Sequence, residues 1–202
     1  HALALALALM RDLPTRITAT SWGEQSGTSL YDANVTILGG GGIATSLAQL
    51  LQPFRTHTTV VRRTGATTLE HLDTALRQAD VVVVALSLTP ETTGVIAAPQ
   101  LEAMPDHAVL VNVARGRHVV TDDLVRALAN GVIAGAGLDV TDPEPLPDGH
   151  PLWREPRCII TPHSADTAEM IRPLLSRRIK ENVTRFANGD ELIGAVDPKL
   201  GY

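Results

Sequence analysis

The amino-acid sequence predicts an α/β fold in which a doubly wound parallel sheet is covered by helices on both faces. From residue 34 onwards, short β-branched runs alternate with longer segments of mixed polarity, as in repeated strand–helix units. Residues 80–86 (DVVVVAL) are too uniformly apolar for a strand that faces water on one side. Aromatic residues make up only 3% of the chain, against 44% for all hydrophobic residues, so Ala, Val, Leu and Ile must form the core.

Six segments are predicted to be strands of this sheet. Each segment is short and rich in apolar residues, and most of the segments contain several β-branched residues. They are residues 34–38, 58–61, 80–86, 108–113, 132–138 and 157–160. Parallel strands are joined by right-handed crossovers, and ligands of such sheets bind at the carboxyl ends of the strands, near the topological switch point. Functional residues are therefore expected at those strand ends.

Helices are predicted between the strands and after the last one. They are residues 43–52, 69–78, 93–104, 122–129 and 166–188. The first stops at Pro53, the fourth ends at the C-cap signal Asn130-Gly131, and the last contains Pro173 as its one unfavourable residue. The Pro-rich residues 142–151 are predicted to form a rigid loop, because a strand pattern resumes after them.

The opening residues 1–10 (HALALALALM) are predicted to be a helix. Ala and Leu are the strongest helix formers, and no basic segment precedes the run as it would in a secretory signal. The run is far shorter than the roughly 20 residues that a membrane span needs. A chain that starts inside a helix pattern is expected to lack upstream sequence, or else to carry a tag or cloning residue at His1.

The charge and cysteine content exclude several classes of partner. The chain has 22 acidic and 17 basic residues, a net charge of −5, and no long basic block. Nucleic acid and anionic membranes are therefore not expected as partners. The single cysteine, Cys158, cannot form an internal disulfide, which fits a reducing, cytoplasmic location. No Cys/His cluster has metal-ligand spacing, so no metal site is expected.

A glycine-rich turn, residues 39–44, links the first strand to the first helix of the sheet. Gly39, Gly41 and Ala44 give the spacing G-x-G-x-x-A. Glycines let the chain turn tightly and approach a pyrophosphate, and a small third residue lets the helix pack against the strand. The helix N-terminus at Gly42 and Ile43 would then face the anion. This context favours a dinucleotide-binding Rossmann fold over a merely flexible turn.

Arg62 and Arg63 follow the second strand, at the place where a fold that prefers NAD usually carries an acid. A carboxylate would repel a 2′-phosphate, whereas guanidinium groups can hold it with paired hydrogen bonds. The cofactor is therefore expected to be NAD(P), with NADP(H) favoured over NAD(H). The alternative is that these are two solvated arginines at a strand end.

Further signatures at strand ends carry a resemblance to a known family. They are NVARG (112–116), AGAGLDV (134–140), TPH (161–163) and, after the third strand, LTPET (88–92). Their order resembles the D-2-hydroxyacid dehydrogenases, over nearly the whole chain to about residue 189. The resemblance implies hydride transfer between a nicotinamide cofactor and a small D-2-hydroxy acid or 2-oxoacid.

The resemblance also implies residue roles. Arg115 would clamp the substrate carboxylate and carbonyl, His163 would exchange a proton with the C2 oxygen, and Glu144 would orient the imidazole and favour its protonated form. Asp139 matches the residue that contacts the carboxamide side of the nicotinamide. The other cofactor contacts are expected at Gly39, Gly41, Gly42, Ile43, Arg62, Arg63, Ser87, Thr92, Val113 and Ala114. Asp166 is expected to be the N-cap of the last helix, or else to place a charge near His163.

The resemblance implies a domain organisation and a partner as well. Residues 1–30 would form an inter-domain helix and arm, residues 31–165 the Rossmann domain, and residues 166–202 a helix returning towards a substrate domain that is mostly absent from this chain. A homodimer is expected through the first helix and the arm, where Trp22 either lies in the interface or packs within its own chain. The alternative function is a dinucleotide sensor, or a corepressor-like scaffold, without turnover.

Overall fold

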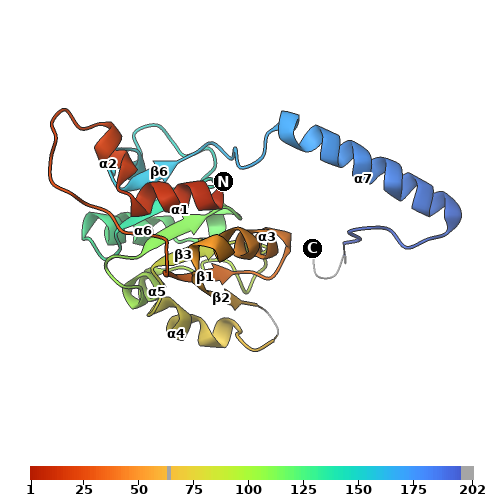
Figure 1. Cartoon of the computed structure of the whole chain (residues 1–202), viewed down its shortest axis with the longest axis horizontal. Helices are drawn as coiled ribbons and strands as arrows, with labels where there is room; N and C mark the ends of the chain where they lie inside the picture. Colours follow the sequence, from red (N-terminus) through yellow and green to blue (C-terminus); the bar gives the residue numbers. More distant parts are fainter. Residues whose placement is uncertain (63–64, 197–202) are drawn as a thin grey trace. The chain divides into compact units, whose positions relative to one another are not determined.

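The computed structural model describes residues 1–62 and 65–196 and divides into two compact units, His1–Pro162 and His163–Tyr202. The first unit contains one six-stranded parallel sheet with the strand order β2-β1-β3-β4-β5-β6 (Figure 1). All six predicted strands are confirmed. Their bounds are β1 Asn34–Leu38, β2 His57–Val61, β3 Val81–Val84, β4 Val109–Asn112, β5 Gly135–Leu138 and β6 Cys158–Ile160.

Strand β1 is the topological switch point of the sheet. The chain leaves β1 to form β2 on one side, and then crosses back to form β3 on the other side. Leu38, the last residue of β1, is in register with Val61 of β2 and Val84 of β3. The carboxyl ends of three strands therefore meet at one level, where a doubly wound sheet opens its binding crevice.

Helices cover both faces of this sheet, as predicted (Figure 1). Val81 and Val83 of β3 pack into the core formed with α1 and α3, while Val82 and Val84 pack into the opposite core, formed with α4, α5 and α6. All four valines are at most 1% exposed, which confirms that β3 is an interior strand. The bounds are α1 Ala2–Met10, α3 Gly42–Leu51, α4 Leu72–Leu76, α5 Ala98–Ala103 and α6 Thr121–Ala129.

The Ala/Leu run at the start of the chain forms α1, the helix that the sequence predicted. Leu5 and Leu9 of α1 are buried against Gly135 and Gly137 of β5. A Cβ on Gly137 would lie 3.0 Å from the Cβ of Leu5, so the helix comes closer to β5 than a strand with side chains there would allow. No helix in the described part of the chain is long and apolar enough to cross a membrane.

Two predicted helices are shorter in the structure. Residues 69–78 form a 3₁₀ turn, Leu69–His71, followed by the five-residue α4. Of residues 93–104, only Ala98–Ala103 are helical, because Gly94 has a φ of +66° and Ile96 forms a bridge with Val119.

The arm, residues 13–30, contains a short helix, α2 Leu13–Ile17, that the sequence did not indicate. The remaining 3₁₀ turns are η1 Gln52–Phe54, η3 Gly116–His118 and η4 Pro151–Arg154.

The second unit consists of the long helix α7, Ala168–Asn188, and the segment after it. The N-cap of α7 is Thr167, whose Oγ1 accepts a hydrogen bond from the backbone N–H of Met170 at 3.4 Å. The prediction that Asp166 caps this helix was therefore wrong by one residue. Pro173 lies inside the helix as expected, and Gly189 ends it with a φ of +76°.

Candidate functional site

The glycine turn begins with a residue that has to be glycine. Gly39 follows β1, has a φ of +124°, and donates its backbone N–H to the carbonyl oxygen of Val61 at 2.8 Å. A Cβ on Gly39 would also overlap the carbonyl group of Ala85, just beyond β3. An L side chain would thus be strained and would clash, because the turn crosses directly above the ends of β2 and β3.

The turn leads into the N-terminus of α3. Gly41 is the N-cap, Gly42 is the first helical residue, and a Cβ on either would meet nothing within 4 Å. Ala44 is buried against the sheet, while Ile43 is 53% exposed. The first backbone amides of a helix have no partner within it, and here they lie beside open space. This geometry is that of a phosphate-binding turn.

Arg62 stands beside this turn at the end of β2. Its backbone N–H donates to the carbonyl oxygen of Thr67 at 2.8 Å, and it forms a bridge with Thr68, so its main chain is fixed. Its exposed side chain passes over Gly40, at a distance of 3.0 Å between the arginine Cγ and the position of a Cβ on that glycine. Arg63 lies outside the described residues.

The loop after β3 is held together by Thr92. Its hydroxyl donates to the carbonyl oxygen of Ser87 at 2.8 Å and accepts the backbone N–H of Thr89 at 2.8 Å. Thr92 is only 8% exposed, whereas Ser87 is exposed. The Thr92 hydroxyl therefore shapes the loop, and the Ser87 side chain is the one of the two that a ligand can reach.

The turn after β4 carries Arg115 on a buried polar frame. Asn112 is fully buried; its Nδ2 donates to the carbonyl oxygen of Arg115 at 2.9 Å, and its Oδ1 accepts the backbone N–H of Ala114 at 3.1 Å. Val113 and Ala114 lie between them. His118, also fully buried, places Nδ1 at 3.0 Å from the same carbonyl oxygen. The Arg115 side chain itself is exposed at the carboxyl edge of the sheet.

Sequence reasoning did not give Asn112 or His118 a role at this turn. In the sequence, Asn112 is visible only as part of the segment that contains Arg115, and His118 is a lone histidine outside any motif. In the structure His118 has a structural role, because it is fully buried and contacts the main chain of Arg115. The only signal in the sequence was its position three residues after Arg115.

The loop after β5 carries Asp139 and Glu144. Asp139 is 1% exposed, and its Oδ1 accepts the Thr161 hydroxyl at 2.5 Å and lies 3.3 Å from Nε2 of His1. Glu144 is exposed on the Pro-rich loop, which Leu146 anchors in the core.

The loops after β4 and β5 are packed against each other. A Cβ on Gly116 would overlap the main chain of Thr141 and Asp142, and the Thr121 hydroxyl donates to the carbonyl oxygen of Asp142 at 2.6 Å. Arg115 and Glu144 therefore stand on adjacent loops of the first unit. His163 is the first residue of the second unit; it is exposed, and its φ is +49°.

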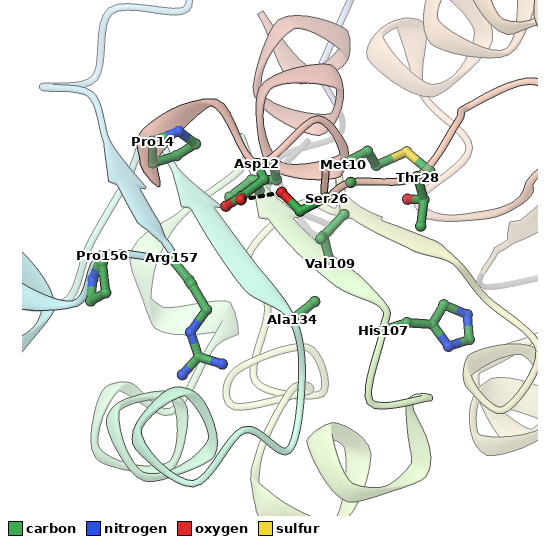
Figure 2. Close-up of a pocket in the computed structure, with 12 residues that line it drawn as sticks. Met10, Asp12, Pro14, Ser26, Thr28, His107, Val109, Ala134, Pro156 and Arg157 are labelled. Atoms are coloured by element: carbon green, nitrogen blue, oxygen red, sulfur yellow. Dashed lines mark hydrogen bonds between the residues drawn. The ribbon is translucent and has the colours of Figure 1, made fainter. Parts of the chain in front are cut away.

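A pocket of about 230 Å³ lies at the amino ends of the strands, away from the carboxyl ends that carry the glycine turn. Val109, the first residue of β4, is one of the residues that line it (Figure 2). Ser26 donates its hydroxyl to the Asp12 carboxylate at 2.6 Å, and this hydrogen bond lowers the pKa of Asp12. The Arg157 guanidinium pairs with Glu155 at 3.1 Å. Asp12 and Arg157 of this pocket are thus paired within the chain, away from the glycine turn. Within residues 1–62 and 65–196, no cluster of His, Cys, Asp or Glu could hold a metal ion.

Comparison with known proteins identifies the family. Residues 3–165 match the model for the NAD binding domain of D-isomer specific 2-hydroxyacid dehydrogenases. The chain belongs to this family. A relative from the family search, an uncharacterized protein in the proB 3′ region of Corynebacterium melassecola, is 41% identical over 99% of this chain and 70% of its own length.

Solved structures of family members share the fold. The D-isomer specific 2-hydroxyacid dehydrogenase from Xanthobacter autotrophicus Py2 was solved in complex with NADPH and MES. It is 36% identical to this chain, with a TM-score of 0.89, and the match covers 99% of this chain and 67% of that one. The NADPH-dependent glyoxylate/hydroxypyruvate reductase from Sinorhizobium meliloti is 26% identical with a TM-score of 0.90, over the same shares. A Thermus thermophilus protein is 35% identical with a TM-score of 0.81, and the chain spans 65% of its length. The chain therefore spans about two thirds of the length of these relatives.

Proposed function

We propose that the protein transfers a hydride between a nicotinamide cofactor, with NADP(H) favoured, and a small D-2-hydroxy acid or 2-oxoacid. The observation that carries this proposal is the phosphate-binding turn built after β1, in a chain that also has Arg115, Glu144 and His163 in the motifs to which the family resemblance assigns catalytic roles. A sensor of dinucleotides would need the turn, but it would have no use for a proton donor and a carboxylate clamp.

The residues at the carboxyl edge fit a bound dinucleotide. Gly39 forms the turn that only glycine can form, and the open N-terminus of α3 would hold the pyrophosphate. Arg62 would hold the 2′-phosphate, and Asp139 would face the nicotinamide carboxamide. Ser87, Val113 and Ala114 would line the remaining length of the cofactor. When bound, the nicotinamide supplies or accepts the hydride.

The substrate would be held and protonated by side chains of this chain. The planar guanidinium of Arg115 would bind the substrate carboxylate and its carbonyl oxygen, and the frame of Asn112 and His118 fixes the main chain from which it extends. His163 would donate a proton to the C2 oxygen during reduction and take one back during oxidation. Glu144 would accept a hydrogen bond from the imidazole and stabilise its protonated form.

The preference for NADP(H) rests on Arg62. This arginine is exposed beside the phosphate-binding turn, at the position where an acid would select NAD(H). The Xanthobacter and Sinorhizobium relatives were solved with NADPH and NADP respectively, and they support the proposal by analogy.

The test is to measure cofactor binding and turnover separately. The protein should bind NADPH more tightly than NADH and oxidise NADPH in the presence of a 2-oxoacid such as glyoxylate or hydroxypyruvate. Arg115→Gln and His163→Ala should each lower kcat by about a hundredfold or more while leaving the Kd of NADPH nearly unchanged. Binding of NADPH without turnover of any 2-oxoacid would favour the sensor function. Loss of NADPH binding in both variants would show that their roles are wrong.

We also propose that the protein is a homodimer and that residues 13–30, the arm, lie in the interface. Trp22 is 99% exposed and Ile17 is 78% exposed, so neither side chain packs within its own chain. An exposed tryptophan on an extended arm is a typical anchor residue for a protein partner. The alternative that Trp22 packs intramolecularly does not agree with this exposure.

A further inference from the structure

We propose that Gly40, the second residue of the glycine turn, determines cofactor specificity by making room for the side chain of Arg62. The inference rests on the proposed preference for NADP(H). The motif G-x-G-x-x-A leaves position 40 open to any residue, so a glycine there needs a reason of its own. The four consecutive glycines at 39–42 are not explained by the turn alone.

The backbone at position 40 does not require glycine. Gly39 has a φ of +124°, but Gly40 is not among the residues with positive φ, so an L-residue could adopt its conformation. Space is what limits this position. A Cβ on Gly40 would lie 3.0 Å from both Cγ and Cδ of Arg62 and 3.1 Å from its Nε. Carbon atoms in favourable contact are about 3.5–4.0 Å apart, so any side chain at position 40 pushes the arginine away.

Arg62 cannot compensate by moving its main chain. Its backbone N–H is bonded to Thr67 at 2.8 Å, it bridges Thr68, and it directly follows Val61, which is fully buried in β2. The main chain of Arg62 therefore stays in place, and the aliphatic part of its side chain lies directly over Gly40. Only rotation of its own bonds can relieve a clash, and such a rotation moves the guanidinium.

The position of the guanidinium matters only for a cofactor with a 2′-phosphate. Paired hydrogen bonds from arginine to phosphate need a defined geometry, and a side chain already held in place loses less freedom on binding. NADH carries a hydroxyl where NADPH carries this phosphate. A side chain at position 40 should therefore weaken NADPH binding and leave NADH binding almost unchanged.

The experiment measures the Kd of NADPH and of NADH for the wild-type chain, Gly40→Leu, Arg62→Gln and the double variant, by fluorescence titration. Loss of a hydrogen-bonded charged contact corresponds to about a tenfold to hundredfold weaker Kd. We expect Gly40→Leu to weaken NADPH binding by about tenfold or more and NADH binding by less than about threefold. The double variant should bind NADPH no more weakly than Arg62→Gln, because both changes remove the same contact.

Two further variants keep the result interpretable. Gly42→Ala adds a Cβ in the same turn that meets nothing of the protein, so it should change both affinities by the same factor. Gly40→Ala needs Arg62 to shift only slightly and should give a smaller loss in the same direction as Gly40→Leu, even where the leucine variant folds poorly.

Three outcomes would overturn the inference: Gly40→Leu keeps the NADPH preference, it weakens both cofactors equally, or its effect adds fully to that of Arg62→Gln. A wild-type chain that binds NADH as tightly as NADPH would instead refute the proposed cofactor preference, and the inference with it. A preference that Arg62→Gln abolishes but Gly40→Leu does not would leave the proposed function intact and remove only the role of Gly40.

Discussion

Two buried side chains, Asn112 and His118, point at the same carbonyl oxygen, that of Arg115. Nε2 of His118 is buried and has no hydrogen-bond partner among the described atoms. A neutral imidazole carries one proton, and an unpaired N–H inside a protein is less well tolerated than an unpaired acceptor. Nδ1 lies 3.0 Å from the carbonyl oxygen of Arg115 and 3.3 Å from its backbone nitrogen. Because the contact with the carbonyl oxygen is the shorter one and an unpaired N–H at Nε2 is disfavoured, we assign the proton to Nδ1 and leave Nε2 as a bare acceptor. The frame then holds the Arg115 carbonyl with two donors.

Cys158 provides a prediction with a defined pH dependence. Burial in β6, together with the nearby Glu155 carboxylate, raises the pKa of its thiol from 9.0 to about 12. The thiolate is the reactive form, so at about pH 8 the folded chain should react with a disulfide reagent roughly a thousandfold more slowly than the unfolded chain. Thiol titration with and without denaturant measures both rates. Equal rates would contradict the raised pKa, and Cys158→Ser is the blank.

The same shift fixes the sign of a stability effect. Above about pH 9 the thiol ionises in the unfolded chain but stays protonated in the folded chain until about pH 12. The contribution of Cys158 to stability is therefore complete below pH 9 and is lost as the pH rises towards 12. Cys158→Ala should reduce the alkaline loss of stability in this window, as measured by urea unfolding.

At the scale of elements, the packing of the loops after β4 and β5 is the contact that brings Arg115 and Glu144 onto neighbouring segments. Gly116 touches the main chain of Thr141 and Asp142, and neither backbone can turn aside as a flexible side chain could. Gly116→Ala should therefore lower the free energy of unfolding by about 1–3 kcal/mol or more. Urea denaturation measures it.

Gly42→Ala is the matched control for this prediction. The added methyl group meets no atom within 4 Å and lies in the first turn of α3, where alanine is the better helix former. Its stability should be unchanged or slightly raised. Equal losses in the two variants would mean that the contact between Gly116 and the β5 loop is not what limits this position.

The sheet could be predicted from the sequence because its signals are local. Each element is predicted by residues within it or next to it. The valines predict β3, the Ala/Leu pattern predicts α1, and the glycines predict the turn after β1. The helix predicted over residues 93–104 is shorter than expected and begins only at Ala98, because Gly94 takes a left-handed conformation that an apolar pattern does not reveal. The N-cap of α7 was predicted at Asp166 and lies at Thr167. Asp and Thr are both favourable N-cap residues, so the sequence alone does not distinguish the two positions.

The candidate site was predictable only in part. Motif order placed Gly39 and Arg115 at strand ends, and the structure places them there. The contact between Gly40 and Arg62 joins residues from two different strands, and the frame under Arg115 depends on which side chains turn inward. Neither arrangement has a sequence period, so a pattern of apolar and polar residues cannot encode it.

At the scale of the whole molecule, the arm provides the test of assembly. If Trp22 anchors a dimer, Trp22→Ala should weaken self-association by about thirtyfold, the effect of losing an interface residue worth about 2 kcal/mol. Sedimentation equilibrium of the wild-type and variant chains measures this. The wild type should be a dimer at concentrations where the variant is a monomer.

Trp153 offers a matched control for the assembly test. It is 50% exposed and donates its indole N–H to the carbonyl oxygen of Pro147 at 3.0 Å, so it is engaged in its own chain. Trp153→Ala should leave the association constant unchanged. A wild-type chain that sediments as a monomer at high concentration would refute the dimer itself.

The two outer strands of the sheet have a consequence for solubility. β6 has only three residues, and β2 presents His57, Thr58 and Thr59 along an edge that ends at the Arg62–Thr68 bridge. Short or polar edges are poor templates for an added strand from another molecule. The highly apolar β3, which would be the segment most prone to aggregation, lies two strands from one edge and three from the other. Fibril growth from the native sheet is therefore blocked at both edges, and aggregation should require unfolding of the core.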